Sequence, residues 1–263
     1  MKKLTALSGL ALVAALTGCS ANAQQATPQG APALIKAGVL KVCTDMPYAP
    51  FESKRGGKPV GFDIDLVNAV ALKLGLTPEI VDTDFDAIAN GDALNSGKCD
   101  MEISAMTITG DRARVLDFSS PYFNASQAMV VAKSSDLKTL DDLAGKRIGV
   151  QADTPGQVYV TDHAPDTADI VPFQDAAALE NAIASGQIAA AVYDNTVVGD
   201  VVSNHPDLSV AAEFDTGEQY GMAVKKNGNV PLLETINGVI ADLKAGNEYE
   251  TIYRRWFGDT KAQ

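Results

Sequence analysis

Three polar side chains that suit the binding of a small carboxylate lie close together in the sequence. Ser104 and Thr107 stand where a predicted short strand, Met101 to Met106, comes to its end. Arg112 follows in the first turn of a predicted short helix, Gly110 to Leu116. Arginine can donate two parallel hydrogen bonds to a carboxylate, and neighbouring hydroxyls can add to them. The alternative is an arginine on a solvated helix face, so the elements around it must decide between the two.

The elements before this stretch predict a parallel sheet. Apolar residues that alternate with polar ones predict strands, and apolar residues at helical spacing predict helices. The resulting order strand–helix–strand–helix–strand is typical of parallel strands with helices on the faces of the sheet. In such sheets, ligands bind outside the carboxyl ends of the strands. The predicted elements are the strands Val39–Thr44, Glu79–Asp82 and Met101–Met106, and helices over Asp63–Leu74 and from Asp84 toward Leu94.

Three more side chains fall just past the ends of these strands. Asp45 and Tyr48 follow the first strand, in a loop whose two prolines exclude helix, and Phe85 follows the second strand. Each position alone is weak evidence. Their convergence with Arg112 on one edge of the sheet predicts a small-ligand site at that edge.

A second unit of the same kind follows in the middle of the chain. Thr154 is the predicted N-cap of a helix that begins with Pro155, so backbone N–H groups there could hold an anion. Asp194 stands just past another predicted strand. Strands or extended segments are predicted at 127–132, 146–151, 169–172, 188–193, 208–212 and 219–225, and helices or helical turns at 140–145, 175–185, 231–245 and 248–257.

The N-terminus has the features of a secretory signal. Two lysines precede the apolar run Leu4 to Leu16, which is too short for a typical membrane-spanning helix and ends in Leu-Thr-Gly-Cys. This ending resembles a bacterial lipobox, in which Cys19 would be lipidated and become the mature N-terminus. The alternative is an ordinary signal cleaved nearby, after Ala23. We expect residues 1–18 to be the signal peptide and residues 19–33 to be a flexible tether.

Composition narrows the possible functions. The chain of 263 residues carries a net charge of −12, and removal of the two signal lysines would make it more acidic. Nucleic acid is therefore not an expected partner, because its phosphates would be repelled. No cofactor or metal is expected, since the sequence shows no phosphate loop, metal-binding cluster or nucleophile elbow, and His163 and His205 lie in polar loops.

Two cysteines remain if Cys19 is lipidated. Cys43 and Cys99 lie at predicted neighbouring strands, and an even pair in an exported protein suggests a disulfide. In the loop-entropy model, this bond would stabilise the fold by roughly 4 kcal/mol. The alternative is two buried thiols.

A set of motifs covers the chain from about Leu34 onward. They are, in order, D-x-x-Y-x-P-F, G-F-D-I-D-L, S-A-M-T-I-T-x-x-R, D-F-S-x-P-Y, D-L-x-G-K-x-x-G-V-Q and a terminal W-F-G. Together they resemble the bacterial extracellular solute-binding proteins, family 3, which feed polar amino-acid importers. The resemblance implies a periplasmic-binding-protein-like (type II) α/β fold with two lobes, each a mostly parallel sheet flanked by helices, and two crossover hinge strands. Lobe 1 would comprise residues 34–124 and 219–263, and lobe 2 would comprise residues 125–218.

By motif position, the resemblance implies how the two charged ends of an amino acid would be held. Arg112 would bind the ligand α-carboxylate, helped by Thr107 and by Thr154 from lobe 2. Asp194, with Ser104, would hold the α-ammonium. A buried zwitterion needs one cation, one anion and further hydrogen bonds to offset its desolvation. Because the charges are divided between the lobes, only the closed state would satisfy both.

The resemblance also implies where the ligand side chain would lie. Tyr48 and Phe85 would flank it as apolar walls, and Asp45 would approach its far end. A carboxylate there tolerates a cationic or amide side chain and disfavours glutamate or aspartate. We therefore expect a polar or basic L-amino acid, with arginine and glutamine as the first choices.

Four positions depart from the family pattern. Relatives usually have glycine where Asp153 stands and an N–H donor where Pro155 stands, so one backbone donor is lost and a negative charge is added. Ala105 replaces a hydroxyl that some relatives carry, and Tyr193 stands where some carry an amide or histidine. The lobe 2 half of the carboxylate site is the part most affected.

The resemblance implies a monomeric binding protein without catalytic activity. It would be exported, lipid-anchored at the outer face of the cell membrane or in the periplasm, and would deliver its amino acid to an ABC permease in the cytoplasmic membrane. The alternative is an enzyme on the same fold, of the cyclohexadienyl-dehydratase kind, which would need only a cleft carboxylate such as Asp45 or Asp194. A third possibility, an exported sensor module, would need a membrane span or a signalling domain, and the sequence shows neither.

Overall fold

The computed structural model of the chain describes residues 30–259. The predicted signal peptide, Cys19 and most of the predicted tether lie outside the described residues. From Ala31 onward, the described residues form one compact α/β unit built on two five-stranded sheets. No helix in this part of the chain is both long and apolar enough to cross a membrane.

The first sheet has the strand order β4-β1-β5-β12-β6. Strand β1 pairs in parallel with β4 and β5, whereas β12 pairs antiparallel with β5 and β6. The parallel part is thus the one predicted from the N-terminal elements, and the C-terminal segment adds the antiparallel strand. The strands are β1 (Val39–Thr44), β4 (Thr77–Asp82), β5 (Met101–Glu102), β6 (Leu116–Phe118) and β12 (Ala223–Lys225).

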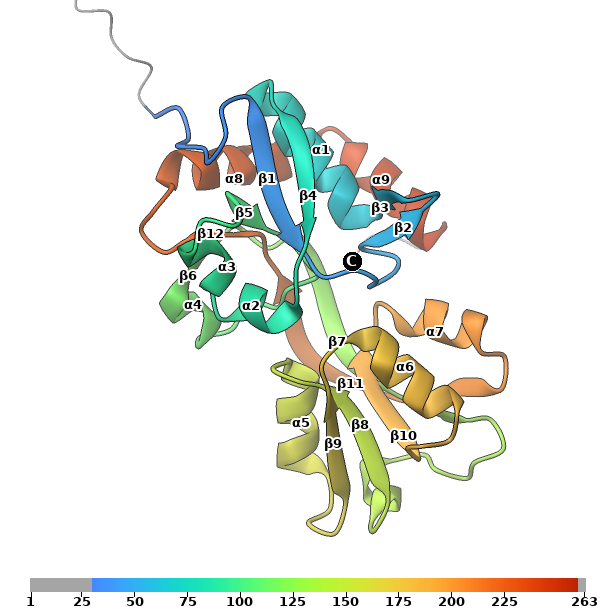
Figure 1. Ribbon diagram of the computed structural model, residues 1–263. Coiled ribbons are helices and arrows are strands. Elements are labelled where there is room, and N and C mark those ends of the chain that lie inside the picture. The colour runs from blue at the N-terminus through green and yellow to red at the C-terminus, as the bar shows by residue number, and fades with distance from the viewer. Residues whose placement is uncertain (1–29, 260–263) are drawn as a thin grey trace, which may run out of the picture. The chain divides into compact units, whose positions relative to one another are not determined.

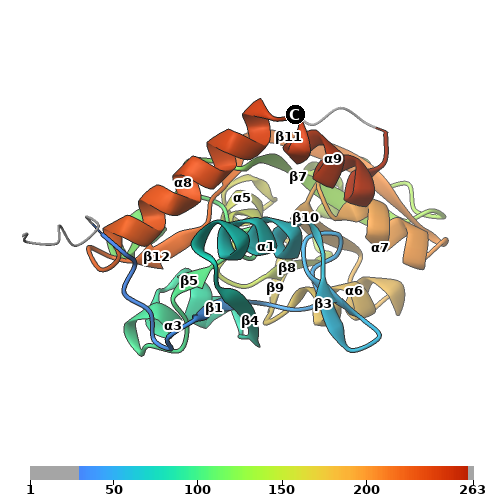
Figure 2. The same ribbon diagram turned by 90° about the horizontal axis from the view of Figure 1, so that it is seen from above.

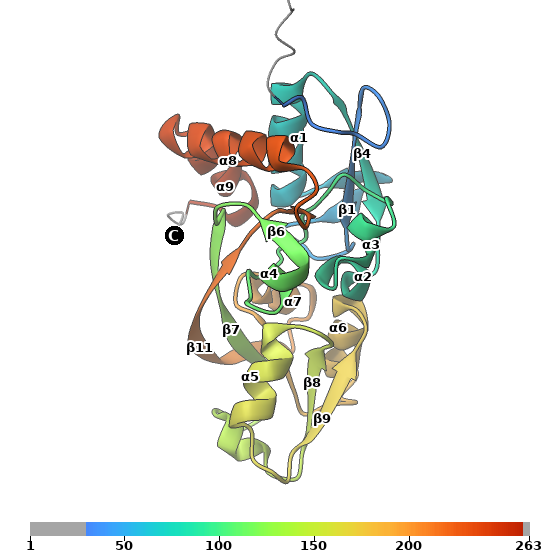
Figure 3. The same ribbon diagram turned by 90° about the vertical axis from the view of Figure 1, so that its left-hand side faces the viewer.

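Helices cover both faces of the first sheet. Adjacent side chains of β1 point to opposite faces, so Val42 joins the apolar cluster under α1, α8 and α9, and Cys43 joins the cluster with α2 and α3. Helices α1 and α8 pack side by side (Figures 2 and 3). The helices are α1 (Phe62–Leu74), α2 (Phe85–Ala89), α3 (Asp92–Asn95), α4 (Arg112–Val115), α8 (Val230–Ala245) and α9 (Glu248–Phe257), and the hairpin β2 (Ser53–Arg55) and β3 (Lys58–Val60) precedes α1.

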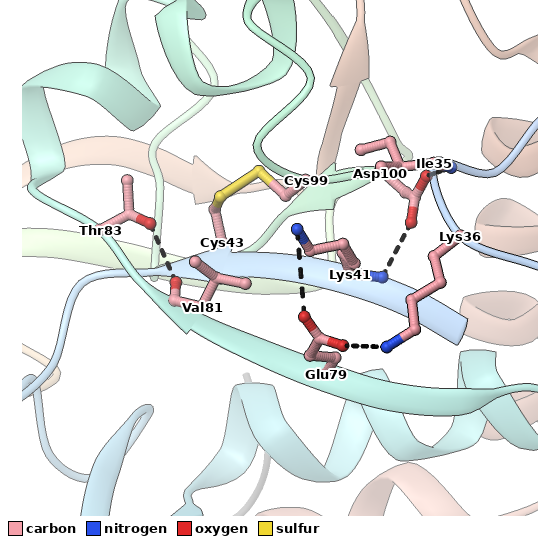
Figure 4. A network of polar contacts seen from close by, with 9 residues as sticks. All are labelled: Ile35, Lys36, Lys41, Cys43, Glu79, Val81, Thr83, Cys99 and Asp100. Atoms are coloured by element: carbon pink, nitrogen blue, oxygen red, sulfur yellow. Dashed lines mark hydrogen bonds and ion pairs between the residues drawn. A yellow bond between two sulfur atoms is a disulfide. The ribbon is translucent and has the colours of Figure 1, made fainter.

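A disulfide and a carboxylate fasten the approach to β5 onto β1 (Figure 4). Cys43 and Cys99 form the disulfide, which confirms that prediction. Next to it, the Asp100 carboxylate accepts hydrogen bonds from the backbone N–H groups of Lys41 and Ile35, each at 2.8 Å. The segment that leads to Ser104 is therefore held to the first strand of the sheet before it reaches the strand ends.

The second sheet has the order β11-β7-β10-β8-β9 and is also flanked by helices. Strands β10, β8 and β9 are parallel, and β7 pairs antiparallel with β10 and β11. The strands are β7 (Phe123–Ala132), β8 (Arg147–Gln151), β9 (Asp169–Phe173), β10 (Ala190–Asp194) and β11 (Leu208–Tyr220). The helices are the 3₁₀ turn η1 (Leu140–Leu143), α5 (Pro155–His163), α6 (Ala176–Ala184) and α7 (Val198–Asn204).

The chain crosses between the two sheets twice. It passes from β6 in the first sheet to β7 in the second, and it returns from β11 to β12. Strands β7 and β11 are neighbours in the second sheet, pair with each other along most of their length and run side by side toward the first sheet (Figure 1). These two are the crossover strands of the two-lobe fold, in which the first sheet and its helices form one lobe and the second sheet and its helices form the other.

Several predicted elements differ in the structure. The strand Met101–Met106 is only two residues long, because Ala105 adopts a φ of 43° and the segment after Glu102 leaves the sheet. The helix from Asp84 toward Leu94 is two short helices, separated where Gly91 has a φ of 81°. The predicted helix Gly110–Leu116 is shorter, Arg112–Val115, and Leu116 already begins β6.

Three differences concern the second half of the chain. The strand predicted at 208–212 is longer in the structure, because β11 continues through two shifts in its pairing with β7 and ends at Tyr220. The extended segment predicted at 219–225 is divided between the end of β11 and β12. Helix α7 was not predicted. No side chain caps its N-terminus at Val197, so the sequence carries no start signal for it.

Candidate functional site

All eight side chains predicted to bind the ligand line one cavity. The eight residues come from both lobes and are Asp45, Tyr48, Phe85, Ser104, Thr107, Arg112, Thr154 and Asp194. The rest of the lining consists of Ala105, Gln127, Gln151, Pro155, Leu179, Val192 and Tyr193.

The ends of parallel strands bring these residues together. Asp45 follows β1, Phe85 begins α2 just after β4, and Ser104 follows β5. On the other lobe, Thr154 lies between β8 and α5, and Asp194 is the last residue of β10. The site therefore forms where the strand ends of both sheets meet, as the topology predicts for α/β sheets.

Arg112 is a buried cation held in a fixed position. Its side chain is 7% exposed, and its guanidinium lies over the Phe85 ring, 5.1 Å from the ring centre. Nη1 donates to the Thr107 carbonyl at 2.9 Å, and Nη2 donates across to the Asp153 carbonyl at 2.7 Å. Burial lowers the pKa of Arg112, whereas the carboxylates of Asp194 and Glu218 oppose that shift. Guanidinium stays charged in proteins, so the cavity has a permanent positive charge with N–H groups to spare.

The two hydroxyls expected to help Arg112 are engaged within the protein. Thr107 Oγ1 donates to Glu218 Oε2 at 3.0 Å. Thr154 Oγ1 donates to the Gln151 carbonyl at 2.8 Å and accepts the Gln157 backbone N–H at 3.3 Å as the N-cap of α5. A ligand carboxylate would therefore have to compete with these internal acceptors for both hydroxyl hydrogens.

The lobe 2 departures from the family pattern have a structural counterpart. Asp153 adopts a φ of 59°, a left-handed conformation that glycine reaches without strain. Its N–H donates to Gln157 Oε1 at 2.9 Å, and Pro155 at the start of α5 has no N–H. Arg112, on the opposite lobe, is consequently the main donor available for an anion in this cavity.

Asp194 is the buried carboxylate of the cavity. Its side chain accepts a hydrogen bond from Gln127 Nε2 at 2.7 Å and a short one from the Tyr220 hydroxyl. Burial, followed by the nearby Glu218 carboxylate, raises the pKa of Asp194 to about 6, although these hydrogen bonds oppose the shift. A carboxylate with this environment is stabilised when a cationic group binds next to it.

Two further buried acids, Glu52 and Asp63, accept hydrogen bonds from Ser104 and Ala105. Ser104 Oγ donates to Glu52 Oε1 at 2.5 Å and accepts the Asp45 N–H at 3.1 Å. Asp63 accepts the Ala105 N–H at 2.8 Å, and burial raises its pKa to about 7. Burial and the adjacent Asp63 also raise the pKa of Glu52 well above its usual range. The hydroxyl of Ser104 is thus oriented with its hydrogen toward Glu52, which leaves an oxygen lone pair for a donor in the cavity.

Asp45 gives one part of the cavity a strongly acidic character. Burial raises its pKa to about 7, and four further carboxylates add to the shift: Asp175, Asp82, Asp84 and Asp86. Asp175 belongs to the lobe of the second sheet and the other three to the lobe of the first, so acids of both lobes add negative potential at Asp45. A cation is therefore favoured in this region and an anion is disfavoured.

Sequence reasoning missed three polar residues of the lining, Gln127, Gln151 and Tyr193. Gln127 is fully buried, and Tyr193, noted only as a departure, is 5% exposed with a hydroxyl that has no hydrogen-bond partner. Gln127 and Tyr193 lie within strands, where the strand-end rule does not apply, whereas Gln151 is the last residue of β8 and the rule could have found it. Within residues 30–259, no group of three His, Cys, Asp or Glu side chains could hold a metal ion.

The chain is similar in sequence to known proteins over most of its length. The model of the family "bacterial extracellular solute-binding proteins, family 3" matches residues 40–259. A probable histidine-binding protein of Neisseria gonorrhoeae is 31% identical, over 100% of this chain and 98% of that protein. ABC transporter arginine-binding protein 1 of Escherichia coli K12 is 36% identical, over 80% of this chain and 87% of that protein.

A solved structure shares both sequence and fold. An ancestral arginine-binding protein bound to arginine is 42% identical, with a TM-score of 0.79, over 84% of this chain and 99% of that one. This similarity extends over both sheets and both crossover strands, and the two-lobe fold predicted from the sequence is confirmed.

Proposed function

Because the chain belongs to the bacterial extracellular solute-binding proteins, family 3, we propose that it captures a basic L-amino acid, arginine first, between its two lobes for an ABC importer. Lobe 1 is taken as residues 34–124 and 219–263, and lobe 2 as residues 125–218. Arginine-binding and histidine-binding relatives of this chain support a basic ligand. Hinge closure of the lobes around the ligand would bury it, as is general for periplasmic binding proteins.

The charge balance of the cavity carries this proposal. One buried cation, Arg112, is matched to the ligand α-carboxylate, and the Asp194 carboxylate to the α-ammonium. Asp45 then remains as an additional negative charge, surrounded by further acids. A ligand with a cationic side chain neutralises this excess, whereas a neutral ligand leaves it and an acidic ligand increases it. The same eight residues are proposed as the ligand contacts.

The cellular setting follows from the same proposal. The protein would be exported, anchored to the membrane through lipidated Cys19, and would work as a monomer that docks on a permease. We propose no catalytic role, because the two cavity carboxylates are accounted for by ligand binding.

Calorimetric titration with the twenty amino acids tests the proposed ligand. Arginine is expected to bind most tightly, followed by other basic and amide amino acids, and glutamate and aspartate are expected not to bind. Binding of glutamate or aspartate alone would show that the charge argument is wrong.

The substitution Asp45→Asn tests the assignment of the far end of the ligand. We expect it to weaken arginine binding by about tenfold or more, because a buried charge pair with the guanidinium is lost, while glutamine binding changes little. The matched control is Asp92→Asn, an exposed acid of the same lobe that neither lines the cavity nor contributes to the raised pKa of Asp45. Equal losses for arginine and glutamine would place the ligand side chain elsewhere.

A further inference from the structure

Four side chains form an unbroken row of hydrogen bonds behind the cavity. Thr107 Oγ1 donates to Glu218 Oε2 at 3.0 Å. Gln127 Nε2 donates to Glu218 Oε1 at 2.9 Å and to Asp194 Oδ1 at 2.7 Å. The row therefore joins Thr107, on the carboxylate side of the cavity, to Asp194, on the ammonium side.

The two middle members of the row lie on the crossover strands. Gln127 is in β7 and Glu218 is in β11, where the pairing of the two strands shifts between Phe214 and Glu218. Thr107 belongs to the lobe of the first sheet and Asp194 to the lobe of the second. Side chains on the hinge thus connect a ligand-facing residue of one lobe with a ligand-facing residue of the other.

The row contains two buried carboxylates, Glu218 and Asp194, and the charge of the buried Arg112 lies near both. Glu218 is 8% exposed, and its carboxylate accepts hydrogen bonds from Thr107, Gln127 and Thr216, all of them neutral donors. It shares the Gln127 amide nitrogen with a second carboxylate, that of Asp194, and its charge raises the pKa of Asp194. The two carboxylates repel each other across the shared donor, and a further cation bound next to Asp194 would reduce this repulsion.

Gln127 also contacts the start of α5. The α-carbon of Gly156 faces the Gln127 carboxamide so closely that a β-carbon there would lie 2.6 Å from Oε1. This amide oxygen has no hydrogen-bond partner, so the orientation of Gln127 is set by its two carboxylate acceptors and by the packing of Gly156. The start of the lobe 2 helix that has Thr154 as its N-cap therefore packs against Gln127.

We propose that Gln127 and Glu218 are positioning residues that set the affinity for the ligand α-ammonium, because they fix the charge and orientation of Asp194 and hold it in register with Thr107 across the crossover strands. This inference rests on the proposed function, since it assigns the ammonium to Asp194. Neither residue needs to touch the ligand. Glu218 supplies negative potential to the ammonium site, and Gln127 keeps the two carboxylates apart.

Substitution of the two residues should move the protonation of Asp194 in opposite directions. Glu218→Gln removes the neighbouring charge, so the pKa of Asp194 is expected to fall below its wild-type value of about 6. Gln127→Leu removes a hydrogen bond to the carboxylate, so the pKa of Asp194 is expected to rise. Titration of the Asp194 carboxyl carbon by NMR in the ligand-free protein measures both shifts and requires no ligand.

Affinity supplies the second readout. Calorimetry with arginine at pH 7.5 is expected to show about tenfold weaker binding for each variant. The matched controls are Glu213→Gln and Gln219→Leu, at exposed positions of the same strand β11, of which Gln219 bonds Asn124 of β7. Both controls are expected to bind within about twofold of wild type.

The outcomes separate the two proposals. Opposite pKa shifts with weaker arginine binding support the positioning role. Shifts of the same sign, no shift, or equal losses in the controls overturn it, because a purely structural role would not change the sign with the substitution. Correct pKa shifts in a protein that binds no amino acid would instead refute the proposed function. If only one variant folds, the sign of its shift is compared with its own expectation, a fall for Glu218→Gln or a rise for Gln127→Leu, and the reverse sign overturns the positioning role.

Discussion

Replacement of Arg112 by alanine is expected to weaken arginine binding by about a hundred- to a thousandfold. The side chain is the buried cation of the cavity, and it is positioned by the Thr107 and Asp153 carbonyls and by the Phe85 ring. Truncation of one member of a buried charge pair costs about 2–5 kcal/mol, because the partner charge stays buried without compensation. Here that partner is the ligand α-carboxylate, and lobe 2 offers few donors that could replace the guanidinium.

Isothermal titration calorimetry with arginine, glutamine and histidine measures this loss. All three ligands should lose affinity to a similar degree, since the α-carboxylate is common to them. Arg112→Lys should also bind weakly, because an ammonium cannot reproduce the two parallel hydrogen bonds. The control is Arg114→Ala, which removes an exposed arginine of the same helix, paired with exposed Asp111, and should leave binding unchanged. Affinity within tenfold of wild type for Arg112→Ala would mean that the carboxylate binds elsewhere.

Much of the site could be predicted because its residues follow a rule of topology. Asp45, Phe85 and Ser104 follow strands whose apolar pattern is clear in the sequence, and parallel strands end on a common edge. The same rule extended to Asp194 in the second sheet. That the two sheets belong to two lobes that face one cavity was inferred from the order of the family motifs, because no local sequence pattern contains this information.

Residues inside the crossover strands could not be found in this way. Gln127 and Glu218 are partners only because β7 and β11 pair with a register shift, and register is set by tertiary packing rather than by local sequence. The same limit applies to β11, which was predicted to end at Ala212 and in fact continues to Tyr220. The strand predicted at Met101–Met106 was too long, since β5 contains only Met101 and Glu102. Residues 101–107 are all buried, so the alternation of apolar and polar residues there does not indicate which side chains face solvent.

Arginine affinity is expected to fall by roughly 500- to 1,000-fold when the pH is lowered from 7.5 to 5. In the free protein, the pKa of Asp45 is raised to about 7 and that of Asp194 to about 6. The ligand guanidinium and α-ammonium bind the ionised carboxylates, so both pKa values must fall in the complex. Below pH 7, each proton on the free protein has to leave before the ligand binds, and affinity therefore decreases as pH falls.

The stability of the ligand-free protein should change with pH in the opposite direction. A carboxyl whose pKa is raised in the folded state binds protons more tightly when folded, so its contribution to stability is largest at low pH and is lost as pH rises through the folded pKa. Asp45, Asp63 and Asp194 all belong to this class. The melting temperature of the free protein should thus decrease from pH 5 to pH 7.5, while the increase in melting temperature caused by arginine becomes larger.

Calorimetry in two buffers of different ionisation enthalpy tests the binding half of this argument. Roughly one to two protons should be released per arginine bound at pH 5.5, and almost none at pH 8. Asp45→Asn removes the titration near pH 7 and leaves the one near pH 6, so its affinity should depend on pH less steeply and over a lower range. Proton uptake on binding, or an affinity that is independent of pH between 5 and 7.5, would contradict the assignment of Asp45 and Asp194 to the two cationic ends of the ligand.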